Sequence, residues 1–88
     1  ALLTDHQIQE FTASYPEWDL AGETIVRSFR FADFVEAMGF VTRVGLEAFH
    51  HPDIDIRWST VTLTLSTHSE GGLTGKDVDL AAAISAIA

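Results

Sequence analysis

The sequence predicts an α+β domain in which an antiparallel four-stranded sheet carries three helices on one face. The chain has 88 residues, which is enough for a single domain over 1–88. Its hydropathy pattern switches between the three- to four-residue spacing of amphipathic helices and the alternation of half-buried strands. The resulting order is helix–strand–strand–helix–strand–strand–helix. Strand pairs separated by helices are typical of an antiparallel sheet with helices packed against it.

The chain opens with a predicted helix. Thr4 and Gln7 have the spacing of a capping box, in which each side chain bonds the backbone N–H of the other residue. Ile8 and Phe11 form the inward face of this helix. We expect it to stop near Tyr15, because the residue before a proline is excluded from helical backbone.

The first strand pair follows this helix. A short strand over 18–20 and a turn at 22–23 precede a longer strand from Ile25 to Phe31. Apolar and polar side chains alternate along the longer strand, except that Arg27 falls among the apolar ones. The pattern therefore predicts a hairpin with one buried face.

A second helix is expected over 32–49, and it is apolar around much of its girth. One stripe recurs at three- and four-residue spacing and consists of Phe34, Met38, Val41 and Val44. Phe40 lies off that stripe, while Val35 and Leu46 widen the apolar surface. Such a helix has to be covered from more than one side. Burial within the monomer and a helix–helix interface in a homodimer or homotetramer both remain open.

The second strand pair and the last helix complete the fold. Ile54, Ile56 and Trp58 alternate with charged residues and predict a half-buried strand over 53–58. A turn at 59–60 leads to a second strand over 61–66, which is rich in β-branched residues. Thr74 then begins the last helix, with Asp77 at the capping-box position.

The composition limits the possible functions. Thirteen acidic residues against 5 Lys and Arg give a formal net charge of −8, which argues against binding to nucleic acid. The absence of Cys excludes disulfides, zinc–thiolate sites and thiol nucleophiles. No apolar run approaches the roughly 20 residues of a membrane span, and no signal peptide is recognised. We expect an acidic, soluble, cytoplasmic domain.

Three of the 4 histidines are expected to converge. His50 and His51 lie at a helix-to-strand junction, and His68 ends the second strand of the following hairpin on its polar face. In an antiparallel hairpin the end of the second strand returns beside the start of the first. Because imidazole titrates near neutral pH, such a cluster can both donate and accept protons.

Two other interpretations of these histidines remain open. They can be separate, hydrogen-bonded surface residues. They can also hold a metal ion, with Asp53 or Glu47 adding a carboxylate, since three histidines form a known zinc arrangement. Adjacent side chains on an extended chain point to opposite sides, so His50 and His51 are poorly placed to chelate one ion.

The chain resembles the pterin-4a-carbinolamine dehydratase family over nearly its whole length. The motifs that carry the resemblance are Phe31-Ala32-Asp33-Phe34, Gly39-Phe40-Val41-Thr42-Arg43-Val44, His50-His51-Pro52-Asp53, Trp58, Thr64-Leu65-Ser66-Thr67-His68, Gly72-Leu73-Thr74 and Asp77. The resemblance implies the same element order as the periodicity. It also implies dehydration of a 4a-hydroxytetrahydropterin to quinonoid dihydropterin, which recycles the pterin cofactor of aromatic amino acid hydroxylases. That reaction needs no metal and no redox cofactor.

The resemblance also implies roles for individual residues. His50, His51 and His68 match the catalytic and pterin-binding histidines. Ser66, Thr67, Asp77 and Trp58 match substrate-site positions. Asp77 can serve as a helix cap as well as orient an imidazole. For Trp58, a place in the core or at the rim of the site is as consistent with the motif as contact with the ligand.

One departure and one alternative function accompany the resemblance. In the family, the helix that precedes the paired histidines is about three residues longer, with a carboxylate four positions before the first histidine. Here Leu46 takes that place and Glu47 follows it. Some members also bind a homeodomain transcription factor, so a non-catalytic interaction module is the alternative to a dehydratase.

Overall fold

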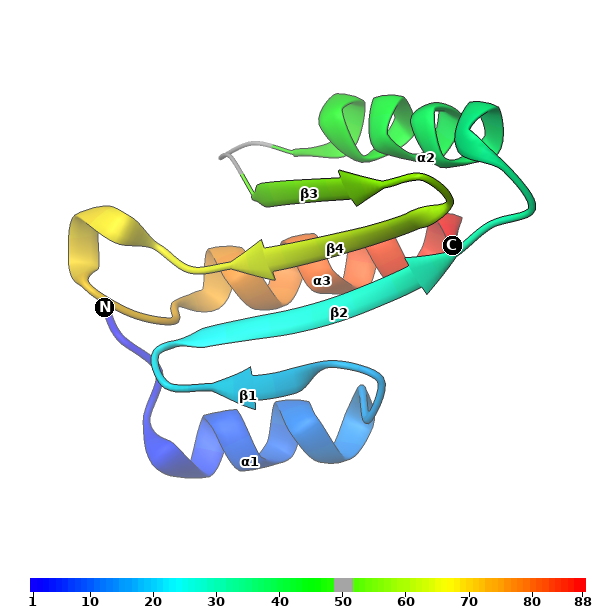
Figure 1. The fold of residues 1–88 in the computed structure, drawn as a ribbon. Helices are drawn as coiled ribbons and strands as arrows, with labels where there is room; N and C mark the ends of the chain where they lie inside the picture. Colours follow the sequence, from blue (N-terminus) through cyan, green and yellow to red (C-terminus); the bar gives the residue numbers. More distant parts are fainter. Residues whose placement is uncertain (49–51) are drawn as a thin grey trace.

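The computed structural model describes residues 1–48 and 52–88. The elements in chain order are α1 (Asp5–Ser14), β1 (Asp19–Ala21), β2 (Thr24–Arg30), α2 (Phe34–Glu47), β3 (Asp53–Arg57), β4 (Thr60–Leu65), the 3-10 turn η1 (His68–Glu70) and α3 (Gly75–Ile87). Apart from η1, this is the predicted order of helices and strands (Figure 1).

The strands form one antiparallel sheet in the order β1-β2-β4-β3. The central pair aligns Ile25 with Leu65 and Phe29 with Val61, and all of these side chains are buried. On the opposite face the hydroxyls of Ser28 and Thr62 hydrogen-bond to each other at 2.9 Å. The alternation therefore gives the sheet one apolar and one polar face.

All the helices contribute to the core on the apolar face. Phe11 of α1, Phe40 of α2 and Ile84 of α3 belong to one buried cluster with the sheet residues. Figure 1 shows α3 running behind the central strands β2 and β4. The predicted α+β class, with three helices on one face of a four-stranded antiparallel sheet, is confirmed.

Arg27 lies on the apolar face, as its position in the alternation predicts. Its guanidinium carbon is 4.3 Å from the centre of the Phe29 ring, and one guanidinium nitrogen donates to Oγ of Ser85 at 3.3 Å. The Trp18 indole donates to the same oxygen at 3.4 Å. Aromatic and hydroxyl partners thus accommodate a charged head on an otherwise apolar surface.

The first helix has the predicted ends. The Gln7 backbone N–H donates to Thr4 Oγ1 at 3.2 Å, and the Thr4 N–H donates to Gln7 Oε1 at 2.9 Å. The helix stops at Ser14, and the N–H of Tyr15 closes its last turn on the carbonyl of Phe11. The capping box and the stop before Pro16 are both confirmed.

The buried face of α2 includes Val44 of the predicted stripe, with Val41 partly buried beside it, but not Phe34 or Met38. The buried residues are Ala37, Phe40 and Val44, whereas Phe34 and Met38 are 42% and 41% exposed. The reason is aromatic packing, because the Phe40 ring lies 4.7 Å from the Phe29 ring and 5.0 Å from the Phe31 ring, centre to centre. The helix also starts at Phe34, after the N-cap Asp33, which is later than predicted.

The turn between β3 and β4 also differs from the prediction. Arg57 pairs with Thr60, so the loop consists of Trp58 and Ser59, and Trp58 is not part of the strand. The favoured two-residue hairpin loops have a residue with positive φ, usually Gly or Asn. This loop contains neither, and Trp58 adopts the positive φ of 54°. Its side chain is 69% exposed.

Across the described residues, we find no helix that is long and apolar enough to cross a bilayer.

Candidate functional site

The predicted site lies at the end of the sheet where β3 begins and β4 ends. Asp53 pairs with Thr64, so the chain entering β3 lies beside the chain leaving β4. This register is the one on which the expected convergence of the histidines depends. His50 and His51 themselves lie outside the described residues.

His68 is not on the strand, in contrast to the prediction. Strand β4 ends at Leu65, and His68 is the exposed first residue of the turn η1. The chain leaves the sheet because the Thr67 N–H donates to the carbonyl of Gly72 at 2.9 Å, which closes a local loop. Gly71 supplies the left-handed backbone, φ 73°, that ends the turn.

Asp77 is fully buried at the start of α3, with 0% of its surface exposed. Its Oδ2 accepts two hydrogen bonds, one from the backbone N–H of Thr74 at 2.9 Å and one from the hydroxyl of Thr67 at 2.8 Å. The first bond, together with the Thr74 side chain, forms the predicted capping box. The second hydrogen bond links the carboxylate to Thr67, the residue that precedes His68.

The hydroxyls of Ser66 and Thr67 are both directed to protein groups. Ser66 Oγ donates to the carbonyl of Glu23 in the β1–β2 turn at 3.2 Å. Thr67 is 5% exposed and hydrogen-bonds to Thr74 Oγ1 at 2.8 Å in addition to Asp77. The structure thus brings Ser66, Thr67, His68 and Asp77 to one end of the sheet.

Trp58 lies at the opposite end of the β3–β4 hairpin from these residues. It follows the 5-residue strand β3, which separates it from the site by about 16 Å at roughly 3.3 Å per residue. Its ring instead stacks on Phe34 at the start of α2. The structure therefore groups Trp58 with α2 and not with Thr67 and Asp77.

The hydrogen bond between Thr67 and Asp77 was not predicted from the sequence. The sequence indicates Asp77 as a cap and Thr67 as a residue of the substrate site, and no local pattern links them. They are separated by 10 positions and by the turn η1, so their contact depends on how the loop closes.

The carboxylates considered for a metal site are exposed. Glu47 ends α2, and Asp53 begins β3. Within residues 1–48 and 52–88, no three His, Asp or Glu side chains gather in a way that could hold a metal ion. The metal alternative depends on His50 and His51, which lie outside these ranges.

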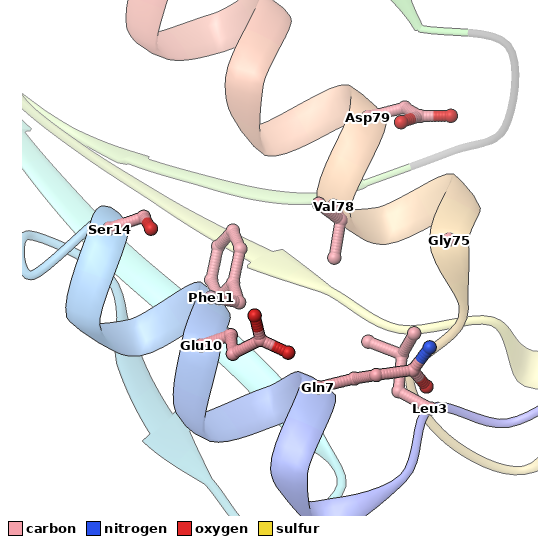
Figure 2. Close-up of a pocket in the computed structure, with 8 residues that line it drawn as sticks. All are labelled: Leu3, Gln7, Glu10, Phe11, Ser14, Gly75, Val78 and Asp79. Atoms are coloured by element: carbon pink, nitrogen blue, oxygen red, sulfur yellow. The ribbon is translucent and has the colours of Figure 1, made fainter.

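A separate pocket of about 310 Å³ lies between α1 and the first turns of α3. Figure 2 shows Phe11 and Val78 pointing toward each other across it, with the Asp79 carboxylate pointing away from the α1 residues. Glu10 on its rim is paired with His6 at 3.2 Å. None of its lining residues belongs to the predicted pterin site, so we assign no pterin to this pocket.

Sequence comparison finds relatives that match this chain over almost its whole length. The family model described as pterin 4 alpha carbinolamine dehydratase covers residues 1–87. A Nocardia farcinica protein, provisionally named pterin-4-alpha-carbinolamine dehydratase, is 50% identical over 90 residues, covering 99% of this chain and 95% of that protein. A Roseiflexus castenholzii protein with the same provisional name is 50% identical over 90 residues, covering 99% and 97%.

A solved structure gives the same result. The crystal structure of a Brucella melitensis protein, described as transcriptional coactivator/pterin dehydratase, superposes with a TM-score of 0.94. The two sequences are 36% identical, and the match covers 100% of this chain and 99% of the other. The chain described here belongs to the pterin-4-alpha-carbinolamine dehydratase family.

Proposed function

We propose that this protein dehydrates a 4a-hydroxytetrahydropterin to quinonoid dihydropterin and water. In this reaction the C4a–O bond breaks as the hydroxyl receives a proton and leaves as water. N5 loses its proton, and a double bond forms between N5 and C4a. One proton is delivered and one is removed, so the reaction requires general acid and base groups but no net oxidation or reduction.

The observation that carries this proposal is the family match over residues 1–87. The arrangement at the end of β4 supports it. A buried carboxylate, Asp77, is hydrogen-bonded to Thr67, the neighbour of His68. A carboxylate commonly orients an imidazole by accepting a hydrogen bond from its ring N–H. The register that pairs Asp53 with Thr64 is the one that the expected cluster of imidazoles requires.

The three histidines divide the work in our proposal. His50, three positions after the last residue of α2 in the sequence, acts as the general acid on the departing hydroxyl. His68 removes or relays the N5 proton. His51 anchors the pterin ring through hydrogen bonds. Ser66 forms part of the wall of the site, and no metal takes part.

We further propose that the protein assembles as a homodimer or homotetramer. Four apolar side chains of α2, here called the α2 patch, are exposed: Phe34, Val35, Met38 and Leu46. Leu46 is 83% exposed. An apolar helix face of this kind is typical of a subunit interface. The strands β1 and β3 are sheet edges and offer a second contact.

The same patch supports one alternative function. An apolar helix face binds a helix of another protein as readily as a second copy of itself. The Brucella melitensis protein is described as both coactivator and dehydratase. A binding module that retains the fold without catalysis is therefore the second candidate.

A direct assay separates the two candidates. The purified protein is mixed with 4a-hydroxytetrahydropterin, and formation of the quinonoid product is followed with and without EDTA. We expect turnover that EDTA leaves unchanged. Absence of turnover above the spontaneous rate favours the binding module, and loss of turnover in EDTA with recovery on adding Zn²⁺ favours the metal alternative.

A further inference from the structure

We propose that Thr67 is a positioning residue for Asp77 and that its side chain does not contact the pterin. The proposal rests on the dehydratase function proposed above and concerns how that site is built. It changes the role that the family resemblance implies for this threonine, from substrate contact to alignment of a carboxylate.

The hydrogen bonds around Thr67 have a defined direction. A threonine hydroxyl carries one proton, and that of Thr67 is donated to Asp77 Oδ2 at 2.8 Å. In the 2.8 Å contact between Thr67 Oγ1 and Thr74 Oγ1, the proton must therefore come from Thr74. The result is a chain of donors from Thr74 through Thr67 to Asp77, in which each bond polarises the next.

These hydrogen bonds reach the Asp77 carboxylate from two parts of the fold at once. The Thr74 N–H that binds Oδ2 belongs to the N-terminus of α3, whereas the Thr67 hydroxyl comes from the start of η1, just after β4. Two donors on one oxygen restrict rotation of the carboxylate, which fixes the direction of its other oxygen. We infer that this fixed direction is what allows Asp77 to orient an imidazole.

Thr67 is itself held firmly enough to act as a reference point. Its N–H donates to the carbonyl of Gly72, and its carbonyl accepts from the N–H groups of Glu70 and Gly71, each at 3.0 Å. Its side chain is 5% exposed, and no buried polar side-chain atom among the described residues lacks a partner. A hydroxyl committed in this way is poorly available to a ligand.

The test replaces the hydroxyl with a methyl group of similar volume. Thr67→Val removes the donor to Asp77 and leaves the Thr74 hydroxyl without its acceptor, whereas Thr67→Ser keeps the hydroxyl. The matched control is Thr62→Val, on the preceding strand β4, which loses the hydrogen bond to Ser28 on the polar face. For each variant we would measure kcat, KM and the pH profile of kcat with 4a-hydroxytetrahydropterin, and confirm folding by circular dichroism.

We expect Thr67→Val to lower kcat about 10- to 100-fold with little change in KM, and to alter the pH profile. Thr67→Ser should recover kcat to within about 3-fold of the wild type, and Thr62→Val should match the wild type. A purely structural role would reduce the melting temperature without moving the pH profile of the folded enzyme. If Thr67→Val does not fold, Thr67→Ala takes its place in the same comparison with Thr67→Ser.

The outcomes distinguish this proposal from the proposed function. Wild-type protein without turnover contradicts the dehydratase assignment, and the role of Thr67 fails with it. Active wild type with an unchanged kcat and pH profile in Thr67→Val overturns only the positioning role. A raised KM with unchanged kcat shows that the hydroxyl contacts the substrate, which also overturns it.

Discussion

The indole ring of Trp58 stacks on the phenyl ring of Phe34, with the ring centres 6.5 Å apart and 18° between the planes. The contact joins the β3–β4 turn to the first residue of α2. Both residues are exposed, Trp58 more than Phe34, so the stack extends the α2 patch beyond the helix. Exposed aromatic rings next to exposed aliphatic side chains are typical of a surface that another molecule covers.

We predict that Met38→Glu lowers the oligomeric state. Met38 is in the α2 patch, and a carboxylate buried in an apolar helix interface without a partner costs several kcal/mol. Light scattering at micromolar concentration should show a smaller mass than for the wild type. Gln9→Glu, which adds the same charge to the exposed surface of α1, is the matched control and should leave the mass unchanged. A wild-type protein that is already monomeric contradicts the assembly proposal.

Truncation of a buried side chain and of an exposed side chain should have different effects on stability. Phe40 is fully buried against Phe29 and Phe31, so Phe40→Ala should reduce the free energy of unfolding by about 3–5 kcal/mol. Leu20, which is half exposed on β1, serves as the control, and Leu20→Ala should cost about 1 kcal/mol or less. Urea denaturation measures both. Equal losses would mean that Phe40 is not the centre of the core.

The order of elements was predictable because each strand and helix carries its own period. The alternation in β2 even placed Arg27 on the apolar face, where it lies. The orientation of α2 was less predictable, because a helix that is apolar on two sides has two candidate inward faces. The choice of Phe40 over Phe34 depends on contacts with β2 and the residue after it, which are remote in sequence.

The site was predictable only as far as local patterns reach. Asp77 was expected as a cap because it lies three residues after Thr74, and this is what the structure contains. Trp58 continues the alternation of β3, so nothing in the sequence indicates that it occupies the turn at φ 54°. The placement of His68 in η1 follows from the Thr67–Gly72 bridge, a contact across a loop that periodicity does not encode.

The paired histidines should differ in their kinetic effects. If His50 is the general acid, His50→Ala should lower kcat about 100-fold or more. If His51 anchors the ring, His51→Ala should mainly raise the dissociation constant of a pterin, measured by titration. An equally severe loss of kcat in His51→Ala, with normal pterin binding, would show that this division of roles is wrong.

The most direct test of histidine acid–base catalysis compares His68→Ala with His6→Ala under saturating 4a-hydroxytetrahydropterin. Both histidines are exposed, but His6 lies in the first turn of α1, where its ring is paired with Glu10, and it is not part of the predicted pterin site. The account predicts that His68→Ala lowers kcat about 100-fold or more while His6→Ala keeps the wild-type kcat. A wild-type kcat in His68→Ala would contradict the account.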